Sequence, residues 1–470
     1  MQSKAGNFKS AFAIVTALFF MWGFITVMND VLINTFEGIF NLTAVQASLV
    51  QMSFFGAFFI ISLLYMTVSS ITGNDPINRI GYKSGMAVSL IICGLGCLGF
   101  YFAAEAHSYD LFLTALFILA TGVTLLQICA NPYVALLGDP DGASGRLNLS
   151  QGLNSLGTTL GPLVGVLLIF RVFSSGEATA QSVGRTYMVY GGVFLLAALM
   201  IFIVNLPSFK NTEKIKPGLS VLKYRHLALG ILAIFFYVGA EVSEGSWLVK
   251  LLQDPNVGNL PKEDANYFLS YYWGGLMIGR LMGTISLGRK RRLKKNLYMA
   301  LTSLALFGFI YFITSIKKES GDFFMDFLQF REVSLFMIFL LVNYIGFVLG
   351  GSKASRLLLV FSLAAIVLLM LVVFSHGQIS FWSAVSLGLF NSIMWSNIFT
   401  LAIRDLGKYT SQGSSLLVMA IVGGAVIPRM QGYVIDNYGV QISYLVPVLS
   451  YVYLAFYGWK GYKPTKIISE

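Results

Sequence analysis

Charged side chains are scarce in this chain of 470 residues: Asp, Glu, Lys and Arg make up 11% of it, whereas 56% of the residues are hydrophobic. A soluble domain of this size would need a largely polar surface, so the composition excludes one. The hydrophobic residues occur in repeated runs of about 20, the length that crosses a bilayer as a helix. These runs lack the alternation of membrane β-barrel strands. We therefore predict an all-α polytopic membrane protein.

Residues on which enzymes and metal centres depend are also few. There are three histidines and three cysteines, and Cys93, Cys97 and Cys129 lie within apolar runs, without the spacing of a disulfide framework or a zinc site. The chain contains neither the G-x-x-x-x-G-K-[ST] motif of ATP-driven motors nor the H-E-x-x-H motif of metalloproteases. We expect a protein that is not an enzyme and that holds no organic cofactor.

Positive charge is concentrated in short segments between the apolar runs, although the whole chain carries a net charge of +11. Two of the most basic segments are Lys210 to Arg225 and RKRRLKK at 289–295. Because Lys and Arg collect in cytoplasmic loops of membrane proteins, this pattern indicates orientation and not nucleic-acid binding. The basic and acidic loops alternate consistently if both termini are cytoplasmic.

The apolar runs predict about fourteen transmembrane helices in two groups. The six spans of the first group lie near 11–34, 46–68, 84–104, 109–132, 148–171 and 186–207. The eight spans of the second group lie near 227–250, 265–288, 297–316, 332–352, 355–375, 380–402, 412–435 and 440–458. We predict an N-terminal six-helix bundle over 1–208, a cytoplasmic linker over 209–226 and a C-terminal bundle over 227–470.

The two halves echo each other. LQICANPYVALLG (126–138) precedes SQG at 150–152, and IMWSNIFTLAIRDLG (393–407) precedes SQG at 411–413. In both halves, an Asn within an apolar run is followed by a short loop and the next predicted helix. Two parallel six-helix repeats are a known transporter architecture, and the echo favours that architecture here.

Four longer motifs carry a resemblance to a known family: FFMWGFITVMND (19–30), LQICANPYVALLG (126–138), RLNLSQGLNSLGTTLGP (146–162) and GSSLLVMAIVGGAVIPRMQGYVID (413–436). With them, the chain resembles the fucose–proton symporter family of the major facilitator superfamily, and more closely its glucose/galactose transporter branch. The resemblance covers nearly the whole chain except about 296–352, which it implies is an inserted helix pair.

The resemblance implies a major facilitator fold of two six-helix bundles in a bacterial inner (plasma) membrane. It also implies a secondary active transporter that brings a monosaccharide such as glucose or galactose into the cell together with a cation, by alternating access. We expect a functional monomer whose partners are the sugar, the coupling cation (Na⁺ or H⁺) and the bilayer, with no nucleic acid. The alternatives from other classes are a channel and a non-transporting sugar receptor.

Asp30 is the most informative single residue. No charged side chain occurs from Ala11 to Asn29, and a carboxylate at membrane depth is costly unless it faces a partner or a cavity. Asp30 shares one helix face with Thr26 and Asn34 through four-residue spacing. A carboxylate near the outer interface, stabilised by water, is one interpretation. An ion-coupling carboxylate is the other, and the resemblance favours it because the family places its protonatable Asp here.

Gln127 and Asn131 line one face of a predicted helix, and Pro132 favours a local break there. Fucose–proton symporters have a Glu that takes part in proton coupling where this chain has Gln127, and an amide cannot carry a proton. A carboxylate with amide and backbone oxygens suits a hard cation. We therefore predict sodium coupling, with Asp30 and Gln127 as ligands. Asn34 and Asn131 belong to the same predicted site. Proton coupling with Asp30 as sole carrier is the alternative.

Amides and aromatic rings on several predicted helices are candidates for sugar binding. Sugar hydroxyls need paired donors and acceptors, which amides supply. Hydrogen bonding between helices is the alternative role of the same side chains. The predicted substrate-binding residues are Gln151, Asn154, Tyr237, Glu241, Tyr267, Asn391, Trp395 and Asn397.

Two other charged residues receive different assignments. Glu244 shares a helix face with Tyr237 and Glu241 but is placed nearer the outer interface. Arg280, in GRLMG, is assigned to a cytoplasmic gate and not to the substrate site.

Overall fold

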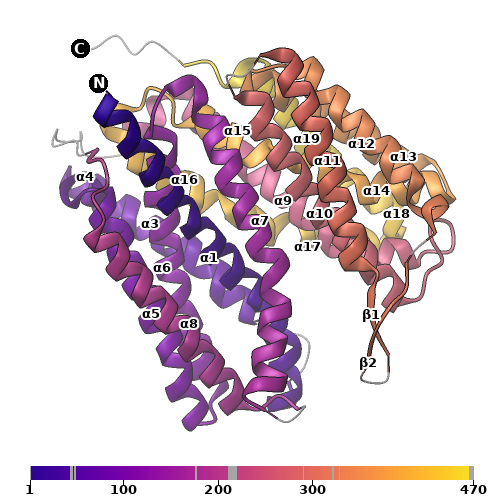
Figure 1. Cartoon of the computed structure of the whole chain (residues 1–470), viewed down its shortest axis with the longest axis horizontal. Coiled ribbons are helices and arrows are strands. Elements are labelled where there is room, and N and C mark those ends of the chain that lie inside the picture. Colours follow the sequence, from indigo (N-terminus) through magenta and orange to yellow (C-terminus); the bar gives the residue numbers. More distant parts are fainter. Residues whose placement is uncertain are drawn as a thin grey trace. The chain divides into compact units, whose positions relative to one another are not determined.

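The computed structural model describes residues 2–42, 46, 49–174, 177–209, 220–288, 291–319, 322–327 and 329–464. Most of them are helical (Figure 1), and they form two compact units. Unit 1 comprises Met1–Ala143, Leu156–Tyr224 and Asp405–Val422, and unit 2 comprises Ser144–Ser155, Arg225–Arg404 and Gly423–Glu470. The predicted linker 209–226 contains the junction at Tyr224, but its residues 210–219 lie outside the described part. The predicted bundle limits of 208 and 227 stay a prediction.

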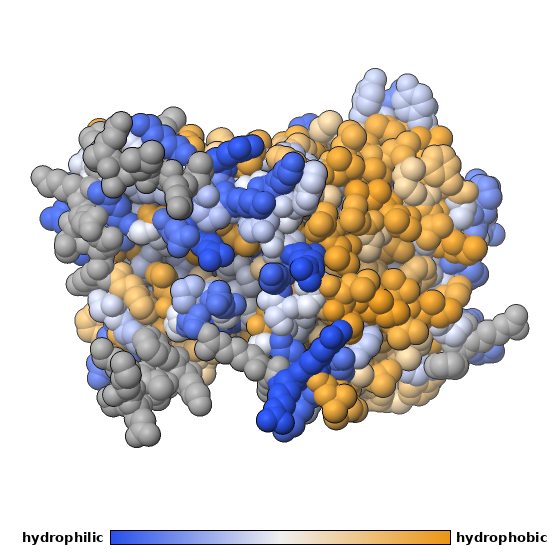
Figure 2. Space-filling model, turned by 90° about the horizontal axis from the view of Figure 1, so that it is seen from above, coloured by the Kyte–Doolittle hydropathy of each residue, from blue (hydrophilic) through white to orange (hydrophobic). Residues whose placement is uncertain are grey.

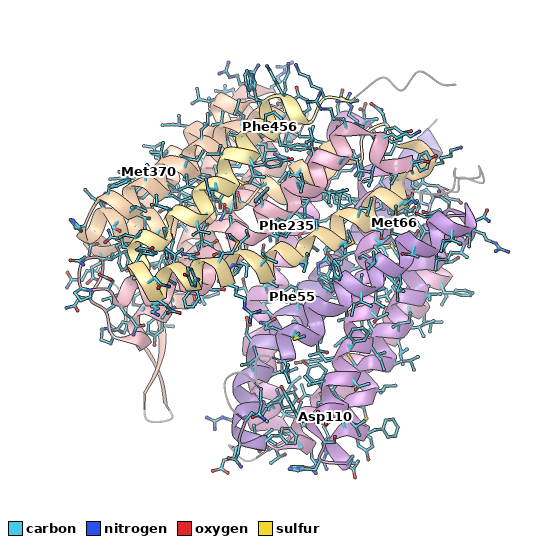
Figure 3. All side chains as sticks on the ribbon, turned by 180° about the vertical axis from the view of Figure 1, so that it is seen from behind. Phe55, Met66, Asp110, Phe235, Met370 and Phe456 are labelled. Atoms are coloured by element: carbon cyan, nitrogen blue, oxygen red, sulfur yellow. The ribbon has the colours of Figure 1, made fainter. Side chains whose placement is uncertain are left out.

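Unit 1 is a bundle in which α5 packs against both α6 and α8. Figure 3 shows Asp110, at the start of α6, at one end of this bundle and Met66, on α3, towards the other. The helices described in unit 1 are α1 (Gln2–Phe40), α3 (Leu49–Thr72), α4 (Pro76–Ile80), α5 (Tyr82–Glu105), α6 (Tyr109–Leu136), α8 (Ala180–Ile203) and α16 (Thr410–Met419). The helix α7 (Ala143–Leu167) begins in unit 2 and continues in unit 1.

Unit 2 contains the remaining helices and one small β-hairpin. The helices are α9 (Arg225–Gln253), α10 (Lys262–Leu287), α11 (Arg292–Thr314), α12 (Phe330–Gly350), α13 (Ala354–Phe374), α14 (Gly377–Asn391), α15 (Met394–Ala402), α17 (Gly423–Tyr438), α18 (Val440–Ser443) and α19 (Leu445–Phe456). The strands β1 (Ile316–Glu319) and β2 (Asp322–Met325) pair antiparallel between α11 and α12. This hairpin was not predicted, and it connects the two helices of the predicted insertion.

Twelve helices in the described residues are long and apolar enough to cross a membrane. They coincide with twelve of the fourteen predicted spans. The other two predicted spans, 148–171 and 265–288, fall on α7 and α10, helices of 25 and 26 residues that carry many of the polar candidates. Large apolar side chains such as Leu293, Phe202 and Leu449 are exposed, as expected of side chains that face lipid. Figure 2 shows such a surface as a broad orange area. The all-helical membrane fold is confirmed.

Three of the predicted spans are interrupted helices, and the one at 440–458 consists of α18 and α19, which are separated at Tyr444. The span at 380–402 consists of α14 and α15, which are separated at Ser392–Ile393, and a 3₁₀ turn separates α16 from α17. By contrast, the break expected at Pro132 is absent, because α6 continues through it to Leu136. The side chain of Asn131 donates to the Gln127 carbonyl at 3.0 Å, so a side chain supplies one hydrogen bond within this turn.

Two segments belong to the opposite unit from the one that chain order suggests. The first, Ser144–Ser155, is held in unit 2 because the Ser144 and Thr400 hydroxyls are 2.5 Å apart. The guanidinium of Arg280 also donates to the hydroxyl of Ser155 at 2.5 Å.

The second segment, Asp405–Val422, is held in unit 1 in a corresponding way. The Asn78 amide donates to the Lys408 carbonyl at 2.7 Å, and the Tyr82 and Ser411 hydroxyls are 3.0 Å apart. Each of the two segments contains one copy of the SQG tripeptide that marked the echo between the halves of the sequence.

The close approach of α5 and α6 depends on small residues, because helices in a membrane gain stability mainly from direct packing. A Cβ atom added to Gly96 would lie 2.4 Å from the Leu119 nitrogen, whereas one added to Gly192 on α8 would meet nothing within 4 Å.

Gly96→Ala should therefore lower the free energy of unfolding by about 1–3 kcal/mol through overpacking. The melting temperature in detergent measures this effect. Gly192→Ala is the matched control and should leave that temperature unchanged or raise it. Equal melting temperatures for the two variants would contradict this account of α5–α6 packing.

Candidate functional site

Asp30 lies on α1 with its carboxylate exposed. The side-chain amide of Gln51, on α3, donates a hydrogen bond to Asp30 Oδ1 at 2.9 Å. The neighbouring Asn29 is 1% exposed, and neither polar atom of its side chain has a hydrogen-bond partner. The spacing analysis did not identify Gln51, because a helix periodicity shows which residues share a face but not which residues on another helix they meet. The side chain of the predicted Asn34 lies outside the described residues.

Gln127 and Asn131 lie one turn apart on α6, as their spacing predicted, and both are buried. Asn131 uses its amide nitrogen within its own helix, and its Oδ1 has no hydrogen-bond donor. In the described part of the chain, neither side chain is hydrogen-bonded to Asp30. The described part of unit 1 also contains the buried carboxylate of Asp75, which accepts from the Tyr65 hydroxyl at 2.8 Å. The grouping of Asp30 with Gln127 around a sodium ion stays a prediction.

In unit 2, Glu241 and Arg280 form an ion pair that joins α9 to α10. Arg280 Nη2 is 3.6 Å from Glu241 Oε1, and both residues are 9% exposed. Arg280 also donates to the Gln151 carbonyl at 3.4 Å. The residue that the sequence assigned to a cytoplasmic gate is therefore in contact with a predicted substrate-binding residue. The contact to Gln151 is to its backbone and leaves its side-chain amide free for another partner.

Glu244 lies one helical turn beyond Glu241 and is 1% exposed. It is buried because α10, α14 and α19 pack against α9. Its position near the outer interface stays a prediction. Asn391 donates to Glu244 Oε2 at 2.7 Å, and the Tyr272 hydroxyl donates to the same oxygen at 3.3 Å. Tyr451 holds the Asn391 amide by donating to its Oδ1 at 2.5 Å.

The same cluster includes Tyr237, whose hydroxyl donates to the Asn391 carbonyl at 3.2 Å. Asn391 is the last residue of α14, so its carbonyl lies at the point where the helix is broken. Both Tyr237 and Asn391 are 0% exposed, and their polar atoms are used within the protein. Their predicted role in sugar binding would require a rearrangement of this cluster.

The remaining predicted substrate residues differ in how many of their polar atoms form hydrogen bonds within the protein. Asn397 accepts from Asn148 at 3.4 Å and donates to the Ala354 carbonyl at 3.3 Å. Trp395 is 7% exposed, and its indole nitrogen has no hydrogen-bond acceptor. Asn154 and Tyr267 are half-buried. Trp395 therefore combines an unused hydrogen-bond donor with an aromatic ring.

Comparison with known proteins places this geometry in context. The family model of the Major Facilitator Superfamily matches residues 10–428. A protein of Brucella abortus named glucose/galactose transporter is 38% identical over 469 residues, which are 98% of this chain and 96% of the relative. A protein of Escherichia coli named L-fucose-proton symporter is 27% identical, over 96% of this chain and 93% of the relative.

A solved structure supports the same relationship. The crystal structure of the E. coli fucose:proton symporter matches with a TM-score of 0.73 and 25% identity, over 96% of this chain and 98% of that one. Together, these similarities confirm the resemblance that the four motifs indicated.

Proposed function

The chain belongs to the major facilitator superfamily, and on this basis we propose that it is a cation-coupled monosaccharide symporter, with glucose or galactose as its substrate. The observation that carries the proposal is similarity over nearly the whole chain to proteins named glucose/galactose transporter and L-fucose-proton symporter. The buried amides and the unused indole donor of Trp395 are side chains of the kind that binds sugar hydroxyls.

Coupling would depend on the charge of Asp30. Gln51 gives this carboxylate a hydrogen bond but no compensating charge. Enclosing an ionised carboxylate away from water is costly, whereas a bound cation removes that cost. The transporter would then close over its sugar when the cation is present and resist closing when it is absent, which discourages leak of either one alone.

Sodium is the favoured coupling ion because Gln127 is an amide and cannot carry a proton. The oxygens of Gln127 and Asn131 suit a hard cation, and Asn131 Oδ1 has no donor. Proton coupling through Asp30 alone is the second candidate, and the relatives named L-fucose-proton symporter favour it. We further propose that the protein works as a monomer in a bacterial plasma membrane, with both termini in the cytoplasm.

Uptake of labelled glucose into proteoliposomes tests the function, with a sodium gradient or a proton gradient imposed in separate runs. Galactose, mannose and fucose serve as competitors. Accumulation driven by sodium alone supports the favoured ion, and accumulation driven by protons alone supports the second candidate. A lack of uptake with both gradients, in protein shown to be folded, would contradict glucose as the substrate.

Asp30→Asn should abolish gradient-driven accumulation but leave sugar exchange between two equally loaded compartments, because exchange needs no net movement of the ion. Asp110→Asn is the matched control, since it removes one carboxylate at the exposed start of α6. Concentrative uptake by Asp30→Asn at the level of the control would exclude Asp30 from coupling.

Gln127→Glu should shift the ion dependence of uptake from sodium towards protons, because it restores a titratable group at the position where fucose–proton symporters have a Glu. The ratio of proton-driven to sodium-driven initial rates measures the shift. If this ratio stays at the wild-type value, Gln127 plays no part in ion selection.

A further inference from the structure

Glu244 is a buried carboxylate that the coupling scheme for Asp30 does not use. It is 1% exposed, and one of its oxygens, Oε2, accepts hydrogen bonds from Asn391 and Tyr272. The other oxygen, Oε1, is fully enclosed and has no hydrogen-bond donor. Both donors to Oε2 are neutral groups, so they orient the carboxylate without cancelling its charge.

The charges of this region do not balance. Glu241 and Glu244 lie on the same face of α9, and the ion pair of Arg280 is with Glu241. Among the residues that the structure describes, no basic side chain is paired with Glu244. The titratable groups around Glu244 are Glu241 on α9, Tyr272 on α10, Tyr444 just before α19 and Tyr451 on α19. Arg280, on α10, is paired with Glu241. A buried carboxylate without a cation is strongly unfavourable in a membrane protein.

We propose that Glu244 is a cation-binding site in unit 2, separate from Asp30, which takes one monovalent cation, a proton or a sodium ion, at its Oε1 side. Neutral oxygens of the type that hard cations prefer lie beside the carboxylate, around Oε2. They are the Tyr272 hydroxyl, 3.3 Å from Oε2, and the Glu241 carbonyl, which accepts from Tyr272 at 2.8 Å. Because Asn391 ends α14 at its break, the cation would stabilise the broken helix as well as the carboxylate.

The proposal extends the proposed symport function, so its test is made in the Asp30→Asn background, where the Asp30 site is absent. The melting temperature of the purified protein is measured in detergent, first as sodium replaces choline at fixed pH and then as a function of pH without sodium. The melting temperature of Asp30→Asn should still depend on either sodium or protons, and this dependence should be lost in the double variant Asp30→Asn, Glu244→Gln. Dependence on sodium or on pH identifies the ion.

Equal ion dependence of the single and double variants would overturn the site, whatever uptake experiments show for Asp30. If Glu244→Gln fails to fold, Glu244→Asp provides the second test. It keeps the charge but withdraws the carboxylate by one methylene, so the ion concentration at half-maximal stabilisation should rise. An unchanged midpoint would also overturn the proposal.

A second, independent feature is a cavity of about 590 Å³ between the end of α10, the start of α11, the end of α12 and the start of α13. It combines basic, hydroxyl and apolar side chains. The lining residues are Ser286, Arg292, Lys295, Asn296, Met299, Phe347, Val348, Leu349, Gly351, Ser352 and Arg356. It contains three cationic side chains and no carboxylate.

The position of the basic groups is defined by the fold. Lys295 is half-buried, and its ammonium group donates to the Ser286 carbonyl at 2.8 Å and to the Ser352 hydroxyl at 2.6 Å. Arg292 and Arg356 are exposed, and within the described ranges neither is paired with a carboxylate. The wall beside them continues into large apolar side chains that are exposed, such as Leu349.

We infer that this cavity binds the phosphate of an anionic phospholipid, with the acyl chains along the apolar wall. Basic pockets between transmembrane helices at a membrane surface recognise such headgroups, and arginine is well suited to phosphate. Phosphatidylglycerol vesicles should raise the melting temperature of the protein relative to phosphatidylcholine vesicles. The double variant Arg292→Gln, Arg356→Gln should lose this difference. Lys294→Gln with Lys353→Gln is the control, because these exposed lysines flank the cavity without lining it.

If the arginine and the lysine double variants lose the lipid preference equally, general surface charge explains the effect, and the site is overturned. A full effect of inorganic phosphate without lipid would overturn the lipid assignment in favour of a soluble anion.

Discussion

Polar groups at membrane depth must find their partners within the protein, because lipid provides no hydrogen bonds. This constraint organises unit 2. The amide nitrogen of Asn391 donates to Oε2 of Glu244, and the amide oxygen of Asn391 accepts from Tyr451. Its carbonyl, at the break between α14 and α15, accepts from Tyr237. One amide thus supports a carboxylate, two tyrosines and an interrupted helix, so these features depend on one another.

The same requirement accounts for the two segments that belong to the unit opposite to the one that chain order suggests. The starts of α7 and α16 carry serine, amide and glycine residues and are poorly suited to a lipid-facing surface. Ser144–Ser155 meets Thr400 and Arg280 in unit 2, and Asp405–Val422 meets Asn78 and Tyr82 in unit 1. The repeated SQG is therefore a structural correspondence as well as a sequence echo.

The candidate site was only partly predictable. Four-residue spacing correctly indicated that Gln127 and Asn131 lie together on a buried face, because both belong to one helix whose geometry is regular. The partners of Asp30 and Glu244 come from helices distant in the sequence. Gln51 on α3 and Asn391 on α14 have no local feature that distinguishes them from other amides in apolar runs. The burial of Glu244 could not be predicted for the same reason, since the periodicity of α9 does not show which helices pack against it.

The sequence by itself determined the membrane environment, the number and position of the long helices and the family, because hydrophobic length and extended motifs are local properties of the chain. Only the tertiary structure decided that α6 continues through Pro132, that α14 and α15 are separate, and which carboxylate Arg280 neutralises. These outcomes depend on which helices pack together. In a membrane, where every helix is apolar, the few polar contacts between helices carry that information.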